Sequence, residues 1–342
     1  MLHPWAYHRP SNFEHTLPAF LVPKTDNTVL PRWVNDYHIL NSNTVLDAHP
    51  LPWVDDILAE CGKGKIWSKS DMTNSFFQTL VHPDDVPLTA VTTPFGLYEW
   101  VVMPMGLKNS PPIHQRRMTN ALHEHIGCIC HVYLDDVIIW SDNLIDHKKH
   151  VNMVMEALQK AHLYLNAKKC YFFLTEVDFL GHHISARGIE PQSSKCEKIM
   201  NWPMPKSATD VRSFLGLVQY ISAFLPNLAD HTVVLTLLTT KDAHKHFPQW
   251  TDAHDFAFQT IKALVCGADC LTVIDHQSPG DNRIFPTCDA SDWHTGAALS
   301  FGATWETARP VAFDSIQLNA AERNYPIHEE ELLAIIRALK KW

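Results

Sequence analysis

The chain has 342 residues, enough for two or three domains with cores of their own. Hydrophobic residues make up 46% and charged residues 19%, the balance of a globular protein, and no apolar run reaches the roughly 18 residues needed to cross a membrane. The first residues lack the basic and apolar regions of a secretory signal. We therefore expect an intracellular protein, cytoplasmic or nuclear, that is neither secreted nor bound to a membrane.

Cysteine spacing and net charge limit the possible functions further. The eight cysteines include two close pairs, Cys128/Cys130 and Cys266/Cys270, and neither has a second pair at zinc-finger spacing. Reduced thiols are therefore expected. The net charge of −9 argues against a nucleic-acid-binding protein. A groove that binds nucleic acid would then depend on local basic patches. The candidates are Arg116-Arg117, Lys148-Lys149 and Lys168-Lys169.

The first half of the chain predicts short strands, one helix and a hairpin. Residues 1–66 are rich in proline and aromatic residues and predict loops and short strands. The stretch 64–70 resembles a strand that ends at an acid, Asp71. A helix is expected over 111–126, and the apolar runs on either side of an Asp-Asp pair predict a hairpin over 131–140.

The second half alternates helices and strands. Apolar periodicity predicts a helix over 149–165, and Ser207-Ala-Thr-Asp210 resembles a capping box that starts a helix ending at Pro226. Strands are expected over 171–174, 179–184, 283–289, 296–301 and 311–313. Pro326 suits the first turn of a last helix. That helix reaches Trp342 without a cap, so we expect a truncated reading frame.

The adjacent acids in Tyr133-Leu134-Asp135-Asp136 are the strongest chemical signal. Neighbouring carboxylates resist ionising together unless a cation lies between them. With Asp71 as a third acid, the pair would hold two Mg²⁺ ions, or Mn²⁺ in their place, about 4 Å apart. Taken alone, the pair is equally well a solvated turn, because aspartate favours turns.

Several ordered blocks resemble the reverse transcriptase of Gypsy-type LTR retrotransposons. They are Arg32–Asn41, Pro50–Ile57, Lys69–Gln78, Thr93–Gln115, the YLDD box, Phe179–His182 (similar to the primer grip) and Arg212–Leu217 (at the thumb). Residues 283–342 resemble the front half of the attached RNase H domain, with Thr287–Ser291 and Glu329–Ala334 as its motifs. The resemblance covers nearly the whole chain.

The resemblance implies roles for individual residues. Asp71, Asp135 and Asp136 match the catalytic metal ligands, and Phe76 matches the aromatic gate that excludes a 2′-hydroxyl. Phe77 beside it is equally apolar, so Phe76 could instead be a core residue. Lys24, Arg32 and Gln115 match nucleotide-binding positions. In the alternative interpretation, Lys24 and Arg32 are surface charges. Lys169 matches a neighbouring basic position, and the Pro104–Gly106 turn matches a template-contacting position.

The RNase H-like segment carries fewer acids than two-metal cleavage needs. Asp289 and Glu331 match its first two acids, and Glu331 would otherwise serve the helix dipole. The other acids would lie beyond Trp342, so we expect no RNase H activity. Four positions depart from the family pattern: His38 for arginine, Asn35 for valine, Ser75 for glycine and His114 for an aromatic residue.

The fold implied is α+β: a right-hand polymerase followed by a partial α/β RNase H-like domain. The expected parts are fingers and palm (1–188), thumb and connection (189–248) and the truncated RNase H-like domain (249–342). The implied function is RNA-directed DNA polymerase, with an RNA or DNA template, a primer, deoxynucleotides and other parts of a polyprotein as partners. The alternatives are a catalytically silent remnant that only binds nucleic acid or protein, and, last, an RNase H-type nuclease.

Overall fold

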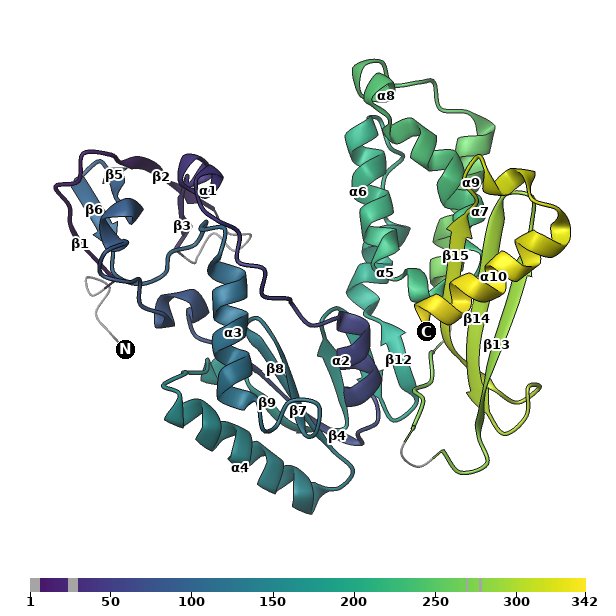
Figure 1. Cartoon of the computed structure of the whole chain (residues 1–342), viewed down its shortest axis with the longest axis horizontal. Helices are drawn as coiled ribbons and strands as arrows, with labels where there is room; N and C mark the ends of the chain where they lie inside the picture. The colour runs from purple at the N-terminus through teal and green to yellow at the C-terminus, as the bar shows by residue number, and fades with distance from the viewer. Residues whose placement is uncertain (1–6, 24–29, 269, 277–278) are drawn as a thin grey trace. The chain divides into compact units, whose positions relative to one another are not determined.

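The structure is a computed structural model that describes residues 7–23, 30–268, 270–276 and 279–342 (Figure 1). It divides into two compact units, each considered separately below. The first comprises Met1–Cys61 and Ile66–Leu174, and the second comprises Gly62–Lys65 and Thr175–Trp342. The expected division at 188 and 248 stays a prediction. In the described part of the chain no helix is both long and apolar enough to cross a membrane.

The first unit contains two sheets. A five-stranded sheet has the order β1-β6-β5-β2-β3 and is antiparallel except where β2 meets β5. Its strands are β1 (His8–Pro10), β2 (Leu17–Val22), β3 (Arg32–Asn35), β5 (Val91–Thr93) and β6 (Gly96–Trp100). A four-stranded antiparallel sheet has the order β7-β8-β4-β9. Its strands are β4 (Ile66–Asp71), β7 (Cys130–Tyr133), β8 (Asp136–Ser141) and β9 (Tyr171–Leu174).

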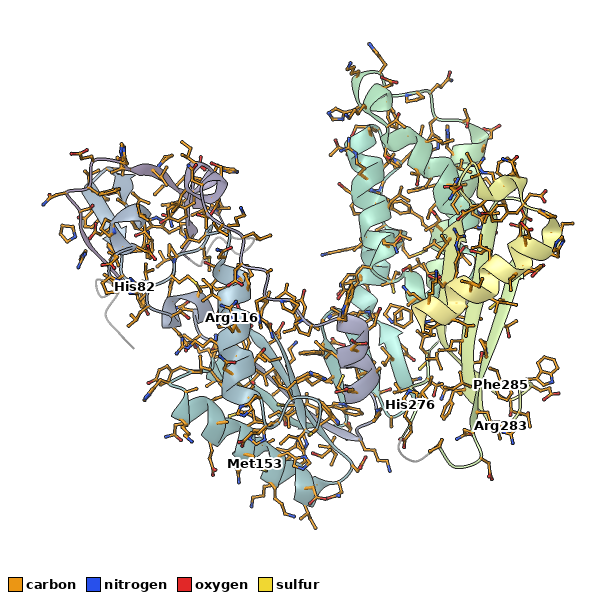
Figure 2. All side chains as sticks on the ribbon, viewed as in Figure 1. His82, Arg116, Met153, His276, Arg283 and Phe285 are labelled. Carbon is orange, nitrogen blue, oxygen red and sulfur yellow. The ribbon has the colours of Figure 1, made fainter. Side chains whose placement is uncertain are left out.

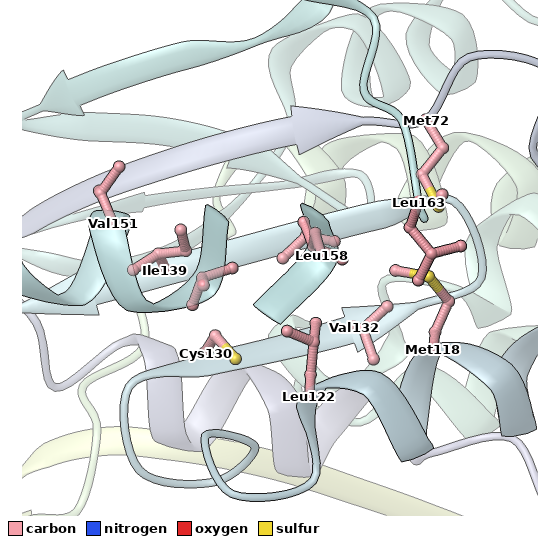
Figure 3. Close-up of a cluster of buried hydrophobic side chains, with 11 residues drawn as sticks. Met72, Met118, Leu122, Cys130, Val132, Ile139, Val151, Leu158 and Leu163 are labelled. Carbon is pink, nitrogen blue, oxygen red and sulfur yellow. The ribbon is translucent and has the colours of Figure 1, made fainter. Parts of the chain in front are cut away.

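Strand alternation gives the four-stranded sheet two buried faces. Val137 and Ile139 of β8 join the apolar cluster formed with α3 (Ser110–Leu122) and α4 (Leu144–Lys160) (Figure 3). On the other face Trp140 stacks on His131, whose imidazole lies 2.6 Å from the Glu60 carboxylate of α2 (Val54–Cys61). Strands buried on both faces read as continuous apolar runs, which is the pattern of β8.

The second unit contains two three-stranded sheets and a set of helices. One sheet has the order β10-β11-β12 and the other β13-β14-β15, and both are antiparallel. The strands are β10 (Glu176–Phe179), β11 (His182–Ser185), β12 (Gly188–Pro191), β13 (Arg283–Ala290), β14 (His294–Gly302) and β15 (Arg309–Gln317). The helices are α5 (Ser193–Met200), α6 (Ala208–Gln219), α7 (Leu228–Thr236), α8 (Lys241–Lys245), α9 (Asp252–Cys266) and α10 (Ile327–Lys341).

Most of the expected elements are present. The strand ending at Asp71, the hairpin, the helix after residue 110, the three C-terminal strands and the helix after Pro326 are confirmed. Ser207 caps α6 by accepting a hydrogen bond from the Asp210 amide, as its sequence predicts. The eight cysteines are all free.

Several boundaries were wrong. The helix expected to reach residue 126 is α3, which ends at Leu122. The helix expected over 149–165 is α4, which begins at Leu144 because Asn143 caps it, and ends at Lys160, just before His162 adopts a positive φ of 53°. The strand expected over 179–184 is interrupted at Leu180 and Gly181, whose φ values of 44° and 71° form the turn between β10 and β11. The helix α6 ends at Gln219, and a short 3₁₀ turn (Ser222–Phe224) fills the space before Pro226.

Two helices were missed in the segment expected to contain only loops and short strands. They are α1 (His38–Ser42) and α2, which has Asp55 and Asp56 in its first turn and Ile57, Leu58 and Cys61 buried. Acids near the N-terminus and apolar residues four apart are helix signals. They were hidden among prolines and aromatic residues.

Candidate active site

Two strands bring the three predicted acids together. Asp71 ends β4 and lies directly opposite Asp136, the first residue of β8. The Met72 amide donates a hydrogen bond of 3.2 Å to the Asp135 carbonyl, which fixes the end of β4 to the hairpin turn. Asp71 is far from Asp135 and Asp136 in the sequence, but all three acids lie at the same end of the two central strands, β4 and β8.

The turn that carries Asp135 and Asp136 is held from α3. Leu134 has a φ of 52°, a left-handed conformation that costs a branched residue energy. Its amide donates a 2.8 Å hydrogen bond to Gln115 Oε1, and Gln115 Nε2 donates to the Val132 carbonyl at 3.2 Å. Gln115 is buried. In this structure it supports the hairpin, and its expected contact with the nucleotide stays a prediction.

The carboxylates differ in their surroundings. Burial raises the pKa of Asp136, and the negative charges of Asp71 and Asp135 raise it further, while Lys69 and Lys169 oppose them. Lys169 Nζ lies 3.1 and 3.0 Å from the two oxygens of Asp71. Lys169 and Asp71 therefore form an ion pair.

His114 is fully buried, and one carboxylate oxygen of the partly exposed Asp135 is buried beside it. The Oδ1 atom of Asp135 is buried without a hydrogen-bond partner, and so are both ring nitrogens of His114. His114 Nε2 lies 3.5 Å from that Oδ1 atom. Burial lowers the pKa of His114 more strongly than the Asp135 charge raises it, so the imidazole is neutral near pH 7.

The two adjacent phenylalanines have different surroundings. Phe77 stacks on Trp100 with ring centroids 5.4 Å apart and belongs to the core of the five-stranded sheet. Phe76 meets the His114 ring edge-on at 5.5 Å. Both lie on a 3₁₀ turn (Ser75–Gln78) that follows Asp71. Phe77 is therefore the core aromatic, and Phe76 lies with the residues around Asp135.

Other predicted positions contribute less. Lys24 lies outside the described residues, and Arg32 is the first residue of β3, where it pairs with Val22. The expected basic patch at Arg116-Arg117 is largely used internally. Arg116, labelled on α3 in Figure 2, bonds Asp47 at 2.5 Å, and Arg117 donates to backbone carbonyls including that of Ala161 at 3.3 Å.

The sequence did not point to Gln78. Its Nε2 atom donates to the Tyr164 carbonyl at 2.9 Å, and its Oε1 atom accepts from the Tyr164 amide at 2.8 Å. The same segment is also tied to Asp71, whose carbonyl accepts a hydrogen bond of 2.8 Å from the Asn166 amide. These bonds attach the segment carrying Lys169 to the acidic site. The available signal for Gln78 in the sequence was its place as the polar residue that ends the turn containing Phe76 and Phe77.

The donor set suits a divalent cation of the Mg²⁺ type. It consists of carboxylate oxygens, which such hard ions prefer, and one of them is a buried oxygen without a partner. Within the described ranges, however, no three acid, histidine or cysteine side chains converge tightly enough to hold a metal ion.

The second unit places the two RNase H-like motifs on adjacent elements. Asp289 is on β13, opposite Gly296 of β14, and Glu331 is on α10. The Glu331 carboxylate contributes to the raised pKa of Cys288, the residue before Asp289, although burial contributes more. The elements carrying the two acids are thus adjacent.

Comparison with known families identifies both units. The reverse transcriptase (RNA-dependent DNA polymerase) model matches residues 22–184, and the model for the RNase H-like domain found in reverse transcriptase matches residues 250–342. The fold is that of a right-hand polymerase followed by an RNase H-like layer, as predicted. Divalent metal ions are the general cofactors of reverse transcriptases.

Relatives place the chain more closely. It is 35% identical over 342 residues to the retrovirus-related Pol polyprotein from transposon opus of Drosophila melanogaster, and 36% identical over 335 residues to that from transposon 297. It is 32% identical over 338 residues to the transposon Tf2-3 polyprotein of Schizosaccharomyces pombe. Between 97% and 98% of the chain is covered, but only 34%, 31% and 24% of these polyproteins. The chain belongs to the reverse transcriptase region of retrotransposon Pol polyproteins, as its resemblance to the Gypsy type implied.

Solved structures agree on the fold. The foamy viral protease-reverse transcriptase in complex with an RNA/DNA hybrid matches 98% of this chain and 44% of that chain, with a TM-score of 0.83 and 24% identity. The same viral protein in complex with double-stranded DNA gives a TM-score of 0.85 over 68% of its chain.

Proposed function

We propose that this chain is an RNA-directed DNA polymerase that adds deoxynucleotides to a primer on an RNA or DNA template. The observation that carries the proposal is the meeting of Asp71 with Asp135 and Asp136 at the same end of β4 and β8, in a chain that belongs to the reverse transcriptase family. The structural neighbours are complexes with an RNA/DNA hybrid and with duplex DNA, which are the substrates proposed here.

The cofactors proposed are two Mg²⁺ ions, which Mn²⁺ can replace. Asp71, Asp135 and Asp136 would hold them. When bound, the ions supply charge neutralisation and activation of the primer hydroxyl. In the reaction, the primer 3′-oxygen bonds to the α-phosphorus, its proton leaves, and the bond to pyrophosphate breaks.

The residues of the chain do the positioning. Gln115 fixes the turn that carries two of the acids, and the raised pKa of Asp136 favours a cation beside it, because a cation relieves the repulsion from Asp71 and Asp135. Phe76 would pack against the sugar and exclude a 2′-hydroxyl. Lys24 and Arg32 would bind the triphosphate. Asp289 and Glu331 would be the first two acids of the RNase H-like motif in the second unit.

Primer extension tests the proposal. A DNA primer on an RNA template is extended with deoxynucleotides and Mg²⁺, and the D135N/D136N double variant is compared with the wild type. We expect a loss of at least about 1,000-fold, because both changed groups are metal ligands. The matched control is D55N/D56N, an exposed acid pair in the first turn of α2.

The two outcomes separate the enzyme from its alternative. Extension by the wild type and the control, but not by D135N/D136N, supports the polymerase. A folded wild type that extends nothing with Mg²⁺ or Mn²⁺ refutes it and leaves the silent remnant. In that case the steepness with which added salt weakens nucleic-acid binding distinguishes a remnant with a basic groove from one without.

A further inference from the structure

His114 lies between the two parts of the site that select and align a nucleotide. Its side chain is fully buried on α3, one residue before Gln115. One side of the imidazole faces the Phe76 ring, with centroids 5.5 Å apart and planes at 76°. Its Nε2 atom is 3.5 Å from Asp135 Oδ1.

A buried imidazole without a hydrogen bond is costly, and so is a buried carboxylate oxygen without one. Here both lie within the same small space. A shift of a few tenths of an ångström turns the 3.5 Å approach into a hydrogen bond from the imidazole N–H to the carboxylate. That bond would occupy Oδ1 and leave the second oxygen of Asp135 for a cation.

The edge-on contact restrains Phe76. Aromatic pairs prefer this T-shaped arrangement because the positive ring edge meets the negative ring face. A phenylalanine at this position could restrain Phe76 equally but could not donate a hydrogen bond to Asp135. The histidine of this chain combines the two contacts.

We propose that His114 is a positioning residue that restrains Phe76 through its ring and Asp135 through its N–H, and so sets the preference for deoxynucleotides over ribonucleotides. The inference rests on the proposed function. It separates into two testable parts, because the ring and the polar group can be removed independently.

The test uses the full chain bound to a primer–template whose primer ends in a dideoxynucleotide, so that binding is measured without turnover. The dissociation constants of the next dNTP and of the matching rNTP are compared. H114F keeps an aromatic ring and loses the N–H; H114Q keeps a polar N–H and loses the ring. H123Q is the control, because His123 is an exposed histidine just beyond α3.

We expect H114Q to lose about ten-fold of the discrimination between the two nucleotides, and H114F to retain it. With a primer that can be extended, H114F should lower kcat and raise the Mg²⁺ concentration needed for half-maximal rate by more than H114Q does. The inference is overturned if the two variants change discrimination equally, if neither changes it, or if the wild type binds both nucleotides alike. Selective binding by a wild type that extends nothing refutes the polymerase and supports this inference.

Discussion

Acidification should weaken the first unit through His147, a fully buried residue of α4. Its Nε2 atom lies 2.7 Å from Ser68 Oγ, and its Nδ1 atom lies 2.9 Å from Ser141 Oγ. A neutral imidazole has one N–H, so at one of these two contacts its ring nitrogen accepts a hydrogen bond from the serine hydroxyl. A second proton on the ring breaks that bond and charges a buried group.

Burial lowers the pKa of His147 from 6.5 to about 4. Between pH 6.5 and about pH 4 the unfolded chain therefore binds a proton at His147 that the folded chain does not bind. The free energy of unfolding falls as the pH falls through this window. At 1.36 kcal/mol for each pKa unit, the loss between pH 7 and pH 4 is about 3 kcal/mol. Above pH 6.5 the contribution of this group is constant.

Hydrogen exchange of the β4 and β8 amides, corrected for intrinsic rates, measures the effect in the full chain. Glutamine at this position cannot titrate, so the opening free energy of H147Q should fall less than that of the wild type as the pH falls. The exposed H123Q serves as the control and should follow the wild type. Parallel curves for wild type and H147Q from pH 7 to pH 4 would refute the reasoning.

Two further variants test contacts around the acids. Gln115→Leu leaves the buried Leu134 amide without its acceptor, so the opening free energy of the hairpin amides should fall by about 1–3 kcal/mol, and an unchanged value would contradict the support assigned to Gln115. Lys169→Gln removes the ammonium group from Asp71. Since partly exposed ion pairs contribute about 0.2–1 kcal/mol, half-maximal extension should need about 1.4- to five-fold less Mg²⁺, and a requirement for more would show that Lys169 does not compete with the ion.

The sequence predicted elements best where one periodicity dominated. The hairpin around Asp135, the strand ending at Asp71 and the helix after Pro326 each follow from apolar pattern and turn or cap residues. The turn at Leu180-Gly181 was missed although Gly181 is itself a turn signal, because apolar residues on both sides of it suggested one strand. A positive φ at a leucine is imposed by tertiary packing, which local pattern does not contain.

The candidate site was predictable in its residues and much less so in its contacts. The acids and Phe76 came from motifs, but the choice between Phe76 and Phe77 depended on which ring meets Trp100. The ammonium group of Lys169 on Asp71 depends on a loop attached through Asn166. Such pairings join segments distant in the sequence, so one sequence without its structure does not specify them.

The short turn after Asp71 has a consequence for how such elements evolve. Because Phe77 is anchored on Trp100 in the core of the five-stranded sheet, that core sets the position of its neighbour Phe76. Under the role proposed for Phe76, repacking around Trp100 would alter which nucleotides are accepted while Asp71, Asp135 and Asp136 stay unchanged. Selection of the nucleotide sugar would then depend partly on packing in the sheet, at residues other than the proposed catalytic acids.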